Sequence, residues 1–140
     1  MEIRRARPEE IGACAVLYVQ VLCETFTWVP PERHHAQDFF RAAREEHVYV
    51  AVEDGRITGL AAFYPPQAFL HSLYVLDRGR GIGKALLDRV IADSGGTLSL
   101  KVQAPNLRAQ AFYAREGFAF VERGSDPGSD VEWIRLARRS

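Results

Sequence analysis

Three alternating glycines form the first pattern in this sequence with chemical potential. The segment Arg78-Gly79-Arg80-Gly81-Ile82-Gly83 follows an expected strand and precedes an expected helix. Glycines let the main chain approach a ligand without an intervening Cβ, and the free N–H groups and dipole of a helix N-terminus favour an anion. Because two arginines add positive charge, the segment predicts a phosphate or pyrophosphate site. The competing interpretation is a tight connection that binds nothing.

Two common nucleotide motifs do not fit this turn. A Walker loop requires G-x-x-x-x-G-K-[ST], but Arg78 stands at the first glycine position and Ala85 at the hydroxyl position. A dinucleotide fingerprint requires G-x-G-x-x-G, and Lys84 occupies the place of its third glycine. The pattern that remains, R-x-x-G-x-G, is typical of acetyl-CoA-binding turns.

A second pattern lies on the expected helix from Asn106 to Glu116. Asn106 and Tyr113 are seven residues apart and therefore share a helix face, about 10 Å apart along the axis. Asn106 can cap the helix or reach a ligand amide, and Ala109 leaves room on the same face. Tyr113 would then present a hydroxyl to a groove, or it is a core tyrosine packed beside Phe112.

The elements that must position these residues alternate along the chain. Strands are expected at Ile3–Ala6, His47–Glu53, Arg56–Tyr64, Ala68–Leu76, Leu98–Gln103, Phe118–Glu122 and Val131–Ala137. A first helix follows Pro8, a second begins near Pro31 with Ala36, Phe39, Phe40 and Ala43 on its inner face, a third follows Gly83, and a fourth spans Asn106–Glu116. The order β-α-α-β-β-β-α-β-α-β-β predicts an α/β fold with a central mixed sheet flanked by helices. The helical crossover between Ala68 and Gln103 predicts one parallel strand pair.

Composition sets limits on the class of protein. The 140 residues are 47% hydrophobic and carry 18 basic and 18 acidic side chains, which predicts one domain over residues 1–140 and gives no reason to expect nucleic acid or membranes as partners. Cys14 and Cys23 lie too far apart on one helix for a disulfide, and no apolar run has the length of a membrane span. We therefore expect a cytoplasmic protein. Adjacent His34 and His35 point about 100° apart on a helix, so no metal site is expected.

Together the two patterns resemble the GNAT superfamily of N-acetyltransferases, and the resemblance covers nearly the whole chain. The first matching segment is Leu73-Tyr74-Val75 followed by Arg78-Gly79-Arg80-Gly81-Ile82-Gly83-Lys84-Ala85-Leu86-Leu87, and the second is Asn106-x-x-Ala109-x-x-Phe112-Tyr113-x-x-x-Gly117-Phe118. The sequence departs from the family in one respect, because only Leu76 and Asp77 separate the strand from the glycine turn. Either the turn is shortened, or the strand register slides by two residues and brings Leu73 next to the thioester.

The resemblance implies roles for these positions. Main-chain groups of Leu73, Tyr74 and Val75 would pair with the pantetheine arm of acetyl-CoA, and one N–H would polarise the thioester carbonyl. The pyrophosphate would lie on the turn and the helix start, with contacts from Arg78, Gly79, Arg80, Gly81, Ile82, Gly83 and Lys84. Asn106, Ala109 and Phe112 would contact the same co-substrate. Tyr113 would donate a proton to the departing thiolate.

The acceptor side is less defined by the sequence. The resemblance implies that Phe26 and Trp28 line the acceptor pocket. His71, on the strand beside the thioester, has the pKa range of a general base, while Glu24 and water-mediated proton removal are the alternatives. Trp133 and the loop from Gly124 to Asp130 are candidates for the acceptor side or for a homodimer contact.

The sequence therefore predicts an N-acetyltransferase that moves the acetyl group of acetyl-CoA to a primary amine of a small molecule or peptide by direct attack in a ternary complex. The alternative is a non-catalytic acyl-CoA-binding regulatory module, and a nucleotide-binding regulatory domain is disfavoured by the failed motifs. Neither the acceptor amine nor the oligomeric state follows from the sequence.

Overall fold

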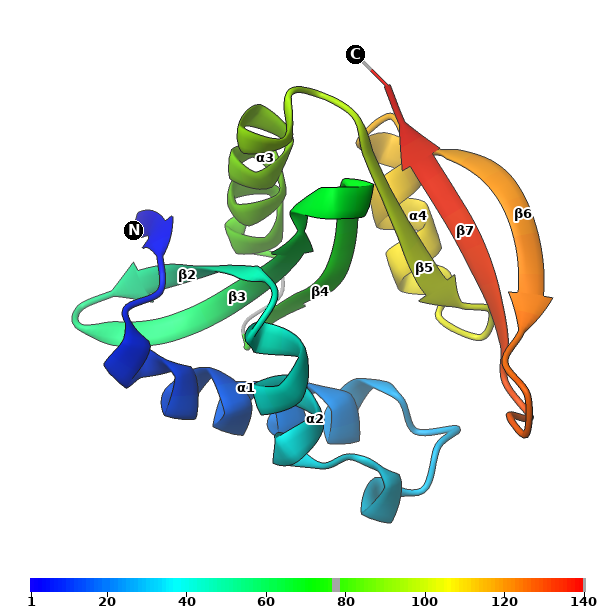
Figure 1. The fold of residues 1–140 in the computed structure, drawn as a ribbon, viewed down its shortest axis with the longest axis horizontal. Coiled ribbons are helices and arrows are strands. Elements are labelled where there is room, and N and C mark those ends of the chain that lie inside the picture. Colours follow the sequence, from blue (N-terminus) through cyan, green and yellow to red (C-terminus); the bar gives the residue numbers. More distant parts are fainter. Residues whose placement is uncertain (77–78, 140) are drawn as a thin grey trace.

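The computed structural model describes residues 1–76 and 79–139, which form a mixed sheet with helices on both sides (Figure 1). The strands are β1 (Glu2–Arg5), β2 (His47–Glu53), β3 (Arg56–Tyr64), β4 (Phe69–Val75), β5 (Leu98–Gln103), β6 (Ala119–Ser125) and β7 (Glu132–Arg138). The helices are α1 (Ile11–Thr25), α2 (Ala36–Ala43), α3 (Ile82–Ser94) and α4 (Leu107–Arg115), with short 3-10 turns at Pro8–Glu10, Pro31–Arg33 and Pro65–Gln67. Within the described residues, no helix combines the length and apolar character that a membrane crossing requires.

The predicted element order and fold class are confirmed. The strands lie in the order β1-β2-β3-β4-β5-β7-β6, and every recorded pair is antiparallel except β4 with β5. This parallel pair is the one that the helical crossover predicts. The β2–β3 hairpin turns at Asp54 and Gly55, whose φ angles of 50° and 77° match the tight turn expected there.

Several boundaries differ from the prediction, most by one or two residues, and two of the differences are larger. The second helix begins at Ala36 rather than near Pro31, and Phe40 is 42% exposed while Phe39 is 3% exposed. Adjacent helical residues point about 100° apart, so only one of the two phenylalanines can face the sheet. In the C-terminal hairpin, Gly124 belongs to β6 rather than to a loop, because it pairs across the strands with Trp133.

The apolar core lies in two layers, one on each face of the sheet. Helices α1 and α2 pack on β2–β4, where alternate residues such as Val50 and Leu60 are fully buried. Helices α3 and α4 pack on the other face, against residues such as Leu98 and Leu136. Successive side chains along a strand point to opposite faces of the sheet, so alternate residues of a strand enter opposite layers of the core.

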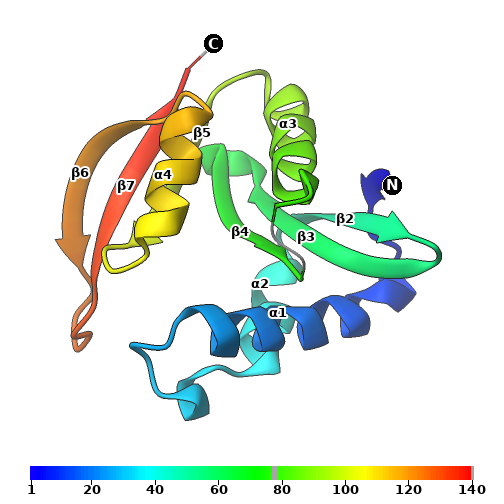
Figure 2. The same cartoon turned by 180° about the vertical axis from the view of Figure 1, so that it is seen from behind.

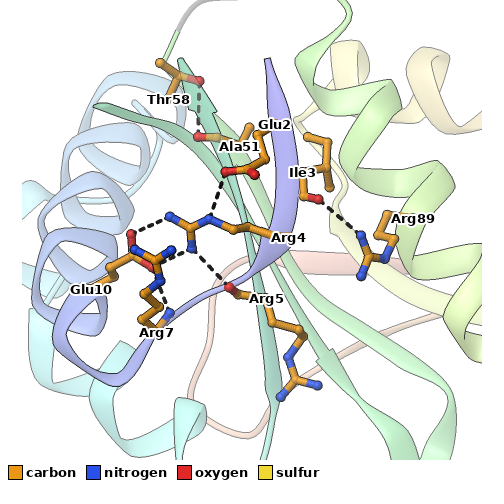
Figure 3. Close-up of polar contacts among 9 residues, drawn as sticks. All are labelled: Glu2, Ile3, Arg4, Arg5, Arg7, Glu10, Ala51, Thr58 and Arg89. Atoms are coloured by element: carbon orange, nitrogen blue, oxygen red, sulfur yellow. Dashed lines mark hydrogen bonds and ion pairs between the residues drawn. The ribbon is translucent and has the colours of Figure 1, made fainter. Parts of the chain in front are cut away.

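Polar contacts fix the N-terminal strand to its surroundings (Figure 3). The Arg4 guanidinium donates to both carboxylate oxygens of Glu10, at 2.8 and 2.9 Å, and the main-chain N–H of Arg7 donates to the same carboxylate at 2.8 Å. On the opposite side, Arg89 of α3 donates to the Ile3 carbonyl at 3.1 Å. These contacts hold β1 between the 3-10 turn that precedes α1 and helix α3.

Candidate active site

The site begins where β4 and β5 separate. Their parallel ladder consists of two pairs, Phe69 with Ser99 and Leu70 with Leu100, after which the strands diverge (Figure 2). Along the separated part, Leu73 and Val75 still pair with β3 on their other side. The edge of β4 that faces the gap therefore offers main-chain N–H and C=O groups to an extended ligand, as an additional strand would use them.

A cavity of about 460 Å³ occupies this separation, a volume typical of small-molecule sites. Residues from α1, β4, the glycine turn, α3 and α4 line it: Val21, Thr25, Phe26, Leu73, Tyr74, Val75, Gly79, Gly81, Ile82, Gly83, Lys84, Asn106, Arg108, Ala109, Phe112, Tyr113 and Arg115. The two sequence patterns thus converge on one cavity, although 23 residues separate Gly83 from Asn106.

The glycine turn forms the floor of the cavity at the start of α3. Gly79 and Gly81 have φ angles of 81° and 79°, in the left-handed region that other residues rarely adopt. A Cβ at either position would meet no atom within 4 Å, so the glycines serve the backbone conformation and leave open space above it. Among the residues that the structure describes, no side chain caps α3, so the N–H groups of its first turn are available to an anion. This cradle fits the pyrophosphate of coenzyme A.

The basic residues at the turn have different surroundings. Arg80 forms an ion pair with Glu53 of β2, and Lys84 forms one with Glu116 at 2.8 Å. The Lys84 ion pair connects α3 to the end of α4. Arg78 lies outside the described residues, and its predicted phosphate contact stays a prediction.

Two cationic residues that sequence reasoning missed also line the cavity, Arg108 and Arg115 of α4. Their spacing from Phe112, four and three residues, places all three on one helix face. The sequence could have indicated both arginines through this spacing, because Ala109 and Phe112 were already predicted to contact the ligand from this side of the helix. The two guanidinium groups give the cavity wall positive charge suited to phosphates.

Asn106 begins α4 as its N-cap. The Asn106 side-chain oxygen accepts a hydrogen bond from the Ala109 N–H at 3.2 Å, and the residue also lines the cavity. Asparagine is a favoured residue for this capping role, which stabilises a helix by about 1 kcal/mol. The cap therefore fixes the end of α4 that borders the cavity.

Tyr113 lies in the core and at the cavity wall at the same time. It is 7% exposed, and its ring packs against Phe112 and Phe118 with centroid distances of 5.1 and 5.4 Å. Burial, and to a smaller extent the nearby Tyr74, raises the pKa of the Tyr113 phenol well above its usual value. The phenol consequently keeps its proton at neutral pH and can act as a donor.

Aromatic side chains of α1 and β4 form the opposite wall. Phe26 lines the cavity, and its ring centroid lies 6.4 Å from that of Tyr74 and 5.3 Å from that of Trp28. Trp28 itself does not line the cavity, and its indole N–H donates to the Gln103 side chain on β5 at 2.5 Å. Trp28 thus fastens the segment after α1 across the gap between the strands.

His71 lies on a β-bulge of β4. The pairing with β3 passes from Ala62–Ser72 to Phe63–Leu70 and omits His71, which is also absent from the cavity lining. Its Nδ1 lies 3.0 Å from Glu46, whose side chain is 6% exposed compared with 48% for His71. The hydrogen bond with Glu46 raises the pKa of His71, against a smaller opposing effect of burial. Sequence reasoning missed Glu46, which sits in the connection after α2 and has no local motif.

Comparisons with known proteins agree with this geometry. The profile of the Acetyltransferase (GNAT) family matches residues 15–118. Similar solved structures include a GCN5-related N-acetyltransferase from Rhodopseudomonas palustris, with a TM-score of 0.82, 19% identity and coverage of 99% of this chain and 94% of that one. A ribosomal-protein-alanine N-acetyltransferase from Brucella melitensis has a TM-score of 0.74 and 23% identity, with both chains fully covered.

A further similar structure is the PaiA N-acetyltransferase from Thermoplasma acidophilum in complex with coenzyme A. Its TM-score is 0.77 and its identity 18%, with coverage of 99% of this chain and 98% of that one. No curated relative matches the sequence. At these identities the solved structures establish the fold, and the family profile establishes the relationship.

Proposed function

Because the chain belongs to the GNAT acetyltransferase family, we propose that it is an N-acetyltransferase that moves the acetyl group of acetyl-CoA to a primary amine of a small molecule or peptide. Family membership supports acyl-CoA use and general acyltransferase activity. The proposal adds the direct attack of the amine in a ternary complex and the roles of individual residues. We further propose a cytoplasmic enzyme whose partner is this amine acceptor rather than a nucleic acid or a membrane.

One observation carries the proposal: the cavity between β4 and β5 brings together the glycine turn, an open strand edge and the buried phenol of Tyr113. Each of these three parts has a separate role in acetyl transfer from a thioester. The turn holds phosphates, the edge holds the amide-containing arm, and the phenol is a proton donor. A domain that only binds acyl-CoA needs the first two parts and has no use for the third.

Orientation and polarisation are the main contributions of the chain. Acetyl-CoA supplies an acyl group activated as a thioester. The open edge of β4 orients that group, and a main-chain N–H of residues 73–75 donates to its carbonyl oxygen. A preorganised donor of this kind lowers the barrier of an acyl transfer by roughly 3–4 kcal/mol, and holding both reactants together lowers it further.

Proton movements complete the reaction. Tyr113 donates its phenolic proton to the thiolate of coenzyme A as the carbon–sulfur bond breaks, and a general acid typically contributes about 10²–10⁴-fold. His71 is our proposed base for the amine, with Glu46 holding its Nδ1 side. The attacking amine must be neutral, so proton removal precedes or accompanies the attack.

A direct test measures coenzyme A release when the purified protein is mixed with acetyl-CoA and a panel of amines. We expect release with at least one amine and a matching mass increase of 42 Da, about the mass of an acetyl group replacing one hydrogen. Binding of acetyl-CoA without acetylation of any amine would instead identify a non-catalytic binding module. Absence of measurable affinity for coenzyme A and its thioesters would overturn both functions.

A further inference from the structure

One face of the C-terminal strands lies open beside the cavity. Inward residues of β5 and β7, such as Val102 and Ile134, enter the core on the side of α4, and the residues between them point the other way. Among the described helices, α1 and α2 lie on the β2–β4 part of the sheet, and none covers this other face of β5–β7 (Figures 1 and 2). We call the side chains of Lys101, Trp133 and Arg135 the open face.

The open face breaks a rule of strand pairing. Lys101 and Arg135 stand directly opposite each other on β5 and β7, an arrangement of like charges that destabilises a sheet. Glu122 of β6 compensates Arg135 at 2.9 Å. Lys101 forms no ion pair among the described residues, and its Nζ lies 4.2 Å from the centroid of the Trp133 ring. Violations of local rules concentrate at functional sites, and an uncompensated cation here would bind an anion.

Trp133 gives this cation a rigid support. The indole lies against the main chain of β6 at Gly124, where an added Cβ would come within 2.6 Å of the ring atom Cζ2. Its N–H donates to Asp126 at 3.3 Å. The carboxylates that contact the open face, those of Asp126 and Glu122, come from the β6 side, while Lys101 lies on β5.

No residue of the open face lines the cavity, but Lys101 lies on β5, near the level at which β4 and β5 separate. Lys101 follows Leu100, the last β5 residue that pairs with β4, so it stands where the two strands begin to separate. Lys101 is one residue beyond the Leu70–Leu100 pair on β5, and Leu73 is three residues beyond it on β4. Leu73 and Lys101 therefore lie roughly 7 Å apart along the strand direction. Gln103, two residues beyond Lys101, holds Trp28. An acceptor whose amine lies near Leu73 must span this separation and the width of the gap for its carboxylate to reach Lys101, which an extended short peptide can do.

From this juxtaposition we propose that the acceptor is an amine that also carries a carboxylate several bonds away, namely a short peptide, and that the Lys101 ammonium binds the carboxylate above the Trp133 ring. The inference rests on the proposed acetyltransferase function and narrows its acceptor. Polyamines are excluded as preferred acceptors, because a second ammonium group would face Lys101. The cation at the open face selects the acceptor by charge rather than by shape.

The test compares acceptors that differ only in the carboxylate. Tripeptides with free amino groups are assayed by coenzyme A release, each beside its carboxamide. We expect kcat/KM to be about 10-fold higher for the acids at low salt, the size of one partly exposed charge-assisted hydrogen bond, and the preference to shrink at high salt. Lys101→Gln removes the preference, and Lys101→Glu makes the carboxamides the better substrates. Arg56→Gln, the same loss of charge at the distant β2–β3 hairpin, leaves the preference intact.

A binding experiment decides the inference independently of turnover. The protein saturated with coenzyme A is titrated with the N-acetylated tripeptide acids and their carboxamides, and the fluorescence of Trp28 and Trp133 is followed. We expect about 10-fold tighter binding of the acids by the wild type and equal binding by Lys101→Gln. Equal binding of acids and carboxamides by the wild type overturns the carboxylate site. Equal acetylation of both overturns it too while leaving the acetyltransferase intact, whereas absence of any acetylation contradicts the enzyme itself.

Discussion

The two halves of the sheet differ in how helices cover them. In β1–β4, helices lie on both faces, and the buried Tyr49 donates to Asp93 of α3 at 2.7 Å. In β5–β7, α4 covers one face, and Tyr113 of that helix lines the cavity. We propose that the first half mainly supplies stability and that the gap and the open face supply ligand contacts. Matched substitutions in the two halves test this division.

The largest contrast is expected between two buried tyrosines. Tyr113→Phe should lower kcat by about 100-fold or more, because it removes the proton donor, while the affinity for coenzyme A changes little. Tyr49→Phe should keep kcat and lower the free energy of unfolding by about 1 kcal/mol through the lost hydrogen bond to Asp93. Steady-state coenzyme A release and urea unfolding measure the two effects. Unchanged turnover of Tyr113→Phe with a good amine would remove Tyr113 from the mechanism.

The next contrast uses two glycines with almost the same backbone. Gly81 and Gly55 have φ angles of 79° and 77°, one at the start of α3 and the other in the β2–β3 hairpin. Alanine at either position should cost about 1–2 kcal/mol of stability, because its Cβ strains a left-handed conformation. Only Gly81→Ala should also weaken coenzyme A binding, by about 10-fold in calorimetry, since only this turn forms the phosphate cradle. Equal affinities for the two variants would refute that role.

A smaller effect is expected at the His71–Glu46 pair, which borders the gap. Because Glu46 raises the pKa of His71, the folded protein holds the imidazole proton more tightly than the unfolded chain does. The pair therefore stabilises the fold fully below the usual histidine pKa of 6.5 and loses this contribution as the pH rises through the folded value. Glu46→Gln should lower the melting temperature at pH 5.5 and change it little at pH 8.5.

The same variant tests the proposed base. Loss of Glu46 should return the His71 pKa toward its usual value, which moves the acidic limb of the kcat/KM profile to lower pH. A limb that stays in place in Glu46→Gln and persists in His71→Ala would assign the base to another group or to water.

The smallest effect is expected at the N-terminal strand, in the half assigned to stability (Figure 3). The Arg4 guanidinium holds the pKa of Glu10 at about 2, below its ordinary 4.5. A depressed pKa stabilises the fold above pH 4.5, and the contribution is lost as the pH falls toward 2. Glu10→Gln should lower the melting temperature at pH 7 by about 2 °C or less, with no change in kcat. A loss of turnover in this variant would show that the halves are coupled.

Sequence reasoning succeeded where the signal is local. The glycine turn and the face of α4 carrying Asn106, Ala109 and Phe112 follow from residue type and helical spacing, and the structure brings them to one cavity. It failed at Phe40, where two adjacent phenylalanines competed for one inner face. The same helical spacing could also have predicted that Arg108 and Arg115 line the cavity.

Other features of the site depend on partners distant in the sequence. Glu46 and His71 lie 25 residues apart, and Trp28 and Gln103 lie 75 apart. No periodicity or motif joins such positions, because strand order and the bulge in β4 determine which of them meet. Trp133 likewise packs against β6 only because the pairing of β6 with β7 sets Trp133 opposite Gly124.

By itself, the sequence determined the family, the order of elements and the two patterns that we propose bind the co-substrate, because these depend on glycine conformation, helical spacing and alternating apolar residues. Only the tertiary structure decided how those patterns share a cavity, which strand edge opens, and that Lys101 forms no ion pair with the other described residues. The physical reason is the strand pairing, because β4 and β5 are joined by two residue pairs and then diverge. The residues that face the gap are therefore determined by strand pairing between distant segments rather than by the local sequence.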